Sequence, residues 1–219
     1  MSLLDELKLQ AQALQEQNQQ VVQSLTQSTV LTEDACRIVW PYLAELAPQL
    51  SVICPDGPQF SVDGKSQWPA MQLTEFRVDS RRKFVRNQDL YASMSMGWGI
   101  VPRVGPPADA HVSVNFPPEL KRAEERMSAA NLAHHRSEIR HPETEKLQAI
   151  RFDFKTELRG SLMVTPDHDN AAVAFRLNNA TGFRVLQFAW PAAAIDVALL
   201  DDMTRLILGR PSAFAAAAA

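Results

Sequence analysis

Three side chains that can bind a metal ion lie close together in the second half of the sequence. His134, Glu138 and His141 are separated by four and three residues, a spacing that places them on one face of a helix. Imidazole and carboxylate groups are competent ligands for zinc or iron. Arg136 and Arg140 lie among them and would oppose a cation. We therefore interpret the three residues as weak metal candidates at a polar helix end, and we expect no metal and no cofactor.

Two further sets of reactive side chains are better explained by folding than by catalysis. Asp167-His168-Asp169 could supply acid–base groups, but these residue types are typical of a turn, and adjacent side chains point apart. Cys36 and Cys54 each fall on the apolar side of a predicted element, so we expect both to pack as small hydrophobic groups. No catalytic residue is assigned.

The sequence lacks the common short motifs of nucleotide-binding and hydrolytic sites. It contains no G-x-x-x-x-G-K-[ST], G-x-G-x-x-G, H-E-x-x-H or G-x-S-x-G segment. With 8 glycines, it has little material for a loop that surrounds phosphate groups. We therefore expect a binding protein. The alternative is an enzyme whose site is assembled from residues distant in the sequence, including the metal candidates above.

A basic segment is the most specific surface feature of the sequence. Residues 76–86 contain one acidic residue and five basic ones: Arg77, Arg81, Arg82, Lys83 and Arg86. We expect 81–83 to form the tip between two strands. Such a tip could bind an acidic protein through its guanidinium groups or, less favoured, contact nucleic-acid phosphates. It could also be solvated, or pair with Asp201 and Asp202 of the same chain.

The first 30 residues predict a long helix. Eight glutamines lie between Gln10 and Gln27, and neither glycine nor proline occurs before Pro41. Apolar residues recur at alternating steps of three and four, which is the heptad spacing of a coiled coil. The a positions are Leu4, Ala11, Asn18 and Leu25, and the d positions are Leu7, Leu14 and Val21.

This heptad seam predicts self-association. An asparagine at an a position, such as Asn18, is satisfied best by its twin across a parallel dimer. The e and g positions carry almost no opposite charges, so the choice of partner would depend on the seam. We expect a homodimer formed through Leu4, Leu7, Leu14, Asn18, Val21 and Leu25. Two alternatives are a helix that packs on its own domain and a disordered glutamine-rich segment.

The rest of the chain predicts an α+β fold with a mainly antiparallel sheet of about six to eight strands. Two helices, near 118–140 and 195–208, would cover the sheet, and a bulge is expected in the first long strand, between Leu73 and Phe76. We divide the chain into an oligomerisation or docking arm, a connecting helix with a kink or a restart near Pro41, an α+β domain beginning with a short strand, and a disordered or artefactual tail. Their respective bounds are 1–30, 31–48, 49–211 and 212–219.

Composition limits the class of protein. The 219 residues include 22 basic and 25 acidic side chains, so the formal net charge is −3, which disfavours a generally cationic nucleic-acid binder. No apolar run is long enough to cross a bilayer, so we expect no membrane partner. Two cysteines and an acidic N-terminus without a secretory signal favour a reducing compartment. The sequence therefore predicts a self-associating cytoplasmic interaction or adaptor protein.

Overall fold

The structure is a computed structural model that describes residues 3–215, apart from the side chains of residues 3–6 and 9. Its fold is α+β, as predicted: a long N-terminal helix precedes antiparallel sheets and two further α-helices. The helices are α1 (Leu3–Ile53), α2 (Pro117–Ala130) and α3 (Val197–Ile207). The strands are β1 (Met71–Val85), β2 (Gln88–Pro102), β3 (Asp109–Val114), β4 (His134–Arg140), β5 (Leu147–Lys155), β6 (Leu158–Asp167), β7 (Ala172–Asn178) and β8 (Val185–Pro191).

Helix α1 is continuous for 51 residues, so the restart expected near Pro41 and the helix end expected at residue 48 are wrong. The short strand expected from residue 49 is also wrong, because that segment is the last turn of the same helix. Val39, Leu43, Ala47 and Leu50 form one buried stripe at helical spacing along this half of α1. Burial of this stripe against the sheet offsets the cost of the two prolines inside the helix, Pro41 and Pro48, each of which removes one backbone hydrogen bond.

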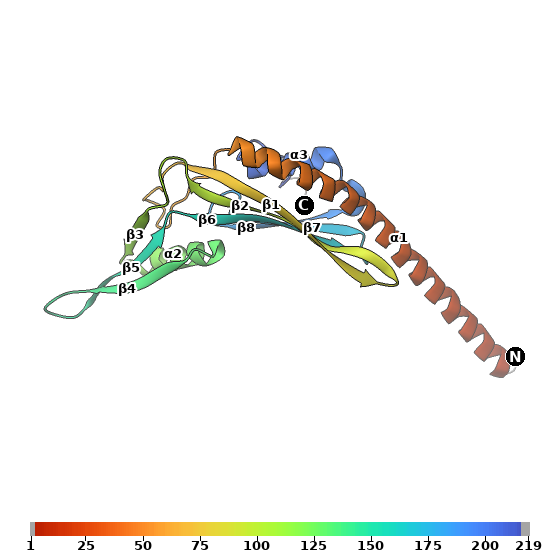
Figure 1. Ribbon diagram of the computed structural model, residues 1–219. Coiled ribbons are helices and arrows are strands. Elements are labelled where there is room, and N and C mark those ends of the chain that lie inside the picture. Colours follow the sequence, from red (N-terminus) through yellow and green to blue (C-terminus); the bar gives the residue numbers. More distant parts are fainter. Residues whose placement is uncertain (1–2, 216–219) are drawn as a thin grey trace.

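The larger sheet has five antiparallel strands in the order β1-β2-β6-β7-β8. Helix α1 runs across one face of this sheet with α3 beside it, and the N-terminal half of α1 projects beyond the sheet (Figure 1). Side chains on the covered face of β2, β6 and β7 are buried, whereas alternate side chains on the other face are small, polar or exposed. The sheet therefore has one open face.

Strand β1 contains the predicted bulge. Its register with β2 shifts between Thr74 and Arg77, and Glu75 has a φ of 53°. A second irregularity lies between Arg81 and Arg82. The first bulge keeps Met71, Leu73 and Phe76 buried on one face although their spacing changes from two residues to three.

The smaller sheet has the order β3-β5-β4 and lies at the opposite end of the molecule from the N-terminus, with α2 beside it (Figure 1). The expected helix from 118 to 140 is wrong in its second half. Helix α2 ends at Ala130, where Asn131 adopts the left-handed conformation with a φ of 51° and caps the helix. Residues beyond it pair with β5 as β4, because this ladder satisfies their backbone groups.

The C-terminal segment that we expected to be a disordered or artefactual tail includes a core residue. Phe214 is fully buried, and its ring contacts those of Phe175, Phe188 and Trp190. The hydroxyl of Ser212 donates to the carbonyl oxygen of Asp202 at 2.7 Å. The domain therefore extends at least to residue 214, and residues 216–219 lie outside the described part of the chain.

Candidate functional site

The N-terminal part of α1 exposes its heptad seam. Every described side chain from Leu7 to Ser24 is exposed, and the exposed fractions of Leu7, Leu14 and Val21 are 54%, 59% and 52%. The alternative in which this helix packs on its own domain is therefore wrong. Leu25 is half-buried, and the side chain of Leu4 lies outside the described residues.

The seam and the sheet-packing stripe lie on the same side of α1. The a series continues beyond Leu25 as Thr32 and Val39, and both of these side chains are fully buried against the domain. One side of a single helix thus changes from exposed to buried near residue 28. The seam ends where the domain begins.

Two turns hold α1 at this boundary. The hydroxyl of Thr32 donates to the backbone oxygen of Asp167 at 3.3 Å. Arg86, in the turn between β1 and β2, donates to the hydroxyl of Thr29 at 3.4 Å and pairs with Asp169 at 2.5 Å. The β1–β2 turn and the β6–β7 turn therefore both contact the base of the arm.

A buried acid–histidine pair lies at the same boundary. Glu33 Oε1 is 2.9 Å from His168 Nε2 and accepts the backbone N–H of Tyr91 at 2.9 Å. Both side chains are at least nine-tenths buried. His168 does lie in the predicted turn, but its pairing with a residue 135 positions away leaves no local signal in the sequence. This contact links α1, β2 and the β6–β7 turn.

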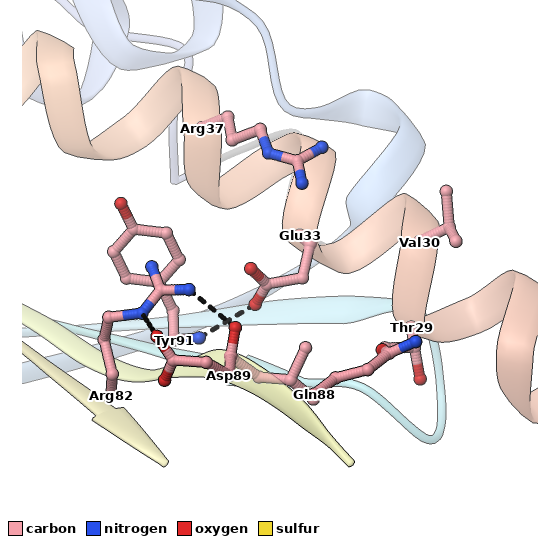
Figure 2. A pocket seen from close by; sticks show the side chains of 9 residues that line it. Thr29, Val30, Glu33, Arg37, Arg82, Gln88, Asp89 and Tyr91 are labelled. Carbon is pink, nitrogen blue, oxygen red and sulfur yellow. Dashed lines mark hydrogen bonds and ion pairs between the residues drawn. The ribbon is translucent and has the colours of Figure 1, made fainter. Parts of the chain in front are cut away.

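A hollow of about 430 Å³ adjoins this pair between α1 and the end of the β1–β2 hairpin (Figure 2). The guanidinium of Arg82 donates to Asp89 at 2.6 Å and lies 4.5 Å from the centre of the Tyr91 ring. Burial, followed by the nearby Glu33, raises the pKa of the Cys36 thiol to about 12. A thiol that stays protonated is a poor nucleophile, so Cys36 packs as a hydrophobic group.

The basic segment is placed differently from our expectation. Residues 81–83 lie within β1, and the hairpin tip is formed by Arg86 and Asn87, with φ values of 53° and 60°. Such a two-residue turn needs positive φ at both positions, and the sequence Arg-Asn is an uncommon signal for it.

The exposed guanidiniums of this segment pair with near neighbours. The partners of Arg77, Arg81 and Arg82 are Glu75, Asp79 and Asp89. The expected intramolecular partners are engaged elsewhere. Asp201 accepts a hydrogen bond from Tyr42, and Asp202 pairs with Arg205.

The three metal candidates do not share a helical face, because the segment that carries them is β4 and the turn after it. His134 Nδ1 lies 2.8 Å from the backbone oxygen of Leu132, and Glu138 pairs with Arg140. His141 Nδ1 accepts backbone N–H groups from the following turn. Among the side chains that the structure describes, no three metal-binding groups converge on one point.

A second hollow, of about 600 Å³, lies on the smaller sheet. His111, Asp153 and His135 are directly opposite one another on β3, β5 and β4. Arg151 donates to Asp153 at 2.8 Å and lowers the pKa of this carboxyl group. The spacing of residues along the sequence does not reveal Asp153 as the neighbour of His111, because the strand register that places the two opposite each other is set by the fold.

Among the described residues, no helix has the length and apolar character needed to span a membrane. The chain matches no family model, no curated protein and no solved structure.

Proposed function

We propose that this chain is a self-associating interaction protein, in which two copies pair through the N-terminal part of α1 and the sheet domains bind a partner. The observation that carries the proposal is the heptad seam, which is exposed along a helix that projects beyond its own domain (Figure 1). Two free cysteines, one of them buried, support a reducing compartment such as the cytoplasm.

A second copy of the same chain is the occupant that best fits the seam. In a parallel, in-register pair each a residue faces its twin, so the two Asn18 amides can hydrogen-bond to each other. An antiparallel pair centred on the Leu4–Leu25 seam would instead place Asn18 level with Ala11, which offers no polar partner. The g positions are Gln10, Gln17 and Ser24, so two identical arms bring no like charges together there.

The seam has the length that a short coiled coil requires. From Leu4 to Leu25 the helix rises by about 32 Å, which corresponds to three heptads. Beyond residue 28 each chain's own sheet occupies the seam side, so the paired segment would end there. In a parallel pair the two α1 helices would have to separate at this point to make room for the two domains. This arrangement keeps the open sheet face of each copy available to a partner.

Light scattering of the full chain tests the proposal. We expect a dimer for the wild type and a monomer for L14E/V21E, because charge at d positions opposes packing of the seam. The matched control is Q12E/Q19E, which adds the same charge to the same helix away from the seam and should remain a dimer. A chain starting at Thr26 keeps the contacts of Thr29 and Thr32 and should be a monomer. A monomeric wild type would show that the proposal is wrong.

A further inference from the structure

Strand β1 is an edge strand whose first half is already covered. The backbone oxygen of Met71 accepts the N–H of Gly57, and the N–H of Leu73 donates to the oxygen of Pro55, both at 2.8 Å. At Phe76 the outward N–H donates to the hydroxyl of Ser51 at 3.0 Å. Residues 55–57, together with Ser51 in the last turn of α1, therefore cover this edge as far as Phe76.

The second half of β1 has a free edge. In an antiparallel ladder, alternate residues direct both backbone groups to the same side, so the outward direction at Phe76 recurs at every second residue. The turn at Arg86 and Asn87 leads to the same assignment. Val85 and Gln88 flank this two-residue turn and hydrogen-bond to each other, so the backbone groups of Val85 point toward β2 and those of Phe84 point outward. The residues with outward backbone groups are Val78, Ser80, Arg82 and Phe84. In the described part of the chain none of their outward N–H groups has a partner.

The free edge is strongly basic. Residues 77–86 carry five basic side chains and one acidic one, although the whole chain is acidic. The side chains of Arg77 and Arg81 are 83% and 81% exposed, and their carboxylate neighbours lie at 3.7 and 4.0 Å. Such exposed, distant ion pairs contribute little and are easily exchanged. A second β1 strand at this edge would bring like charges together, which disfavours pairing between copies.

Space for side chains exists on both sides of the edge. The side chains of an added strand would alternate between the open face, beside Arg81 and Lys83, and the side covered by α1. On the α1 side they would meet the hollow lined by Arg37 and Arg82 (Figure 2), whose guanidiniums form exposed ion pairs with Asp34 and Asp89. Guanidinium and ammonium groups thus lie on both faces of the unoccupied strand position, accompanied on the α1 side by the carboxylates of Glu33 and Asp89.

We propose that an extended acidic segment of a partner protein binds to β1 as an added strand along residues 77–85. Backbone hydrogen bonds to the outward groups would supply affinity, and carboxylates beside Arg37, Arg81, Arg82 and Lys83 would supply specificity. This inference deepens the proposed function, since it names the partner chemistry of the sheet domain, but it does not depend on pairing of the arm.

Binding of a labelled nine-residue peptide of alternating glutamate and valine, followed by fluorescence anisotropy with the full chain, tests the inference. We expect saturable binding that R81E/K83E weakens by about tenfold or more and that the corresponding lysine–valine peptide lacks. S80P removes one outward N–H and leaves the ladder with β2 intact, so it should also weaken binding by about tenfold. R176E is the matched control on the same open face, away from β1, and should bind as the wild type does.

Amide exchange measured by NMR on the wild-type chain separates edge pairing from simple charge attraction, even if S80P fails to fold. Peptide should protect the amides of Val78, Ser80, Arg82 and Phe84, and L14E/V21E should bind it equally. Binding without this protection would overturn the inference. So would the absence of binding, or binding of a fifteen-residue oligothymidylate in place of the peptide with no effect of S80P. A monomeric wild type that binds the peptide would contradict only the coiled coil.

Discussion

At the scale of single residues, the hydrogen-bonded pair of Glu33 and His168 connects the long helix to the sheet. Its two side chains come from α1 and from the β6–β7 turn, and Glu33 also accepts the N–H of Tyr91 at the start of β2. Buried polar groups of this kind need their partners, because an unsatisfied one keeps the cost of desolvation. The sequence identified His168 as part of a turn, yet no local pattern could connect it to a helix 135 residues earlier.

We predict that H168A lowers the free energy of unfolding by about 1–3 kcal/mol, because Glu33 remains buried with only the Tyr91 N–H as a partner. Urea denaturation measures this loss. D169A is the control in the same turn: it removes an exposed ion pair with Arg86 and should cost less than about 1 kcal/mol. The double variant E33A/H168A should lose less than the sum of the two single variants. Additive losses would show that the pair does not act as a unit.

At the scale of elements, the sequence predicted those segments whose period is long and unambiguous. The mainly antiparallel strand pairing, the bulge in the first long strand and the helix near 195–208 all agree with the structure. Predictions that were based on shorter sequence patterns were wrong. The helix does not restart at Pro41, because the buried stripe of α1 continues past it. The charged segment 134–140 is a strand, because β5 pairs with its backbone. Long-range pairing decided these cases, and it leaves no local trace.

The contact between β6 and β2 yields an element-scale prediction. A Cβ at Gly160 would lie 2.0 Å from Nε1 of the buried Trp98, so G160A must displace the indole ring and should lower the free energy of unfolding by about 1–3 kcal/mol. Gly97 lies on the open face of the same sheet, where the nearest neighbour of a new Cβ is 3.9 Å away. G97A should therefore leave stability unchanged or raise it by up to about 1 kcal/mol. Equal losses from both variants, measured by thermal denaturation, would contradict this account of the sheet.

At the scale of the whole molecule, the two halves of helix α1 lie in different environments. Its C-terminal half packs on the sheet, and its N-terminal half projects into solvent with the same side apolar (Figure 1). The sequence predicted the exposed seam and the basic residues of the candidate site. It could not predict the free edge of β1 or the hollow beside Arg82, because both arise where segments distant in the sequence meet.

The orientation of two paired arms can be read from one engineered cysteine. In a parallel, in-register dimer the two copies of Leu7 face each other at a d position, within the distance that a disulfide spans. In an antiparallel dimer centred on the Leu4–Leu25 seam, Leu7 lies level with Val22, and the two copies of residue 7 are about 22 Å apart.

We therefore predict that L7C, in a C54S background, forms a covalent dimer on mild oxidation, as measured by non-reducing electrophoresis. Q19C is the matched control, because its position on the outer side of the helix keeps the two thiols apart in either orientation. A dimer by light scattering that L7C does not cross-link would show that the arms run antiparallel.

The effect of N18L depends on this orientation. In an antiparallel dimer Asn18 would have no twin, and N18L should stabilise the dimer without changing its orientation. In the parallel dimer, by contrast, N18L should raise stability while allowing other oligomeric states to form, because the buried amide pair that specifies two strands is lost.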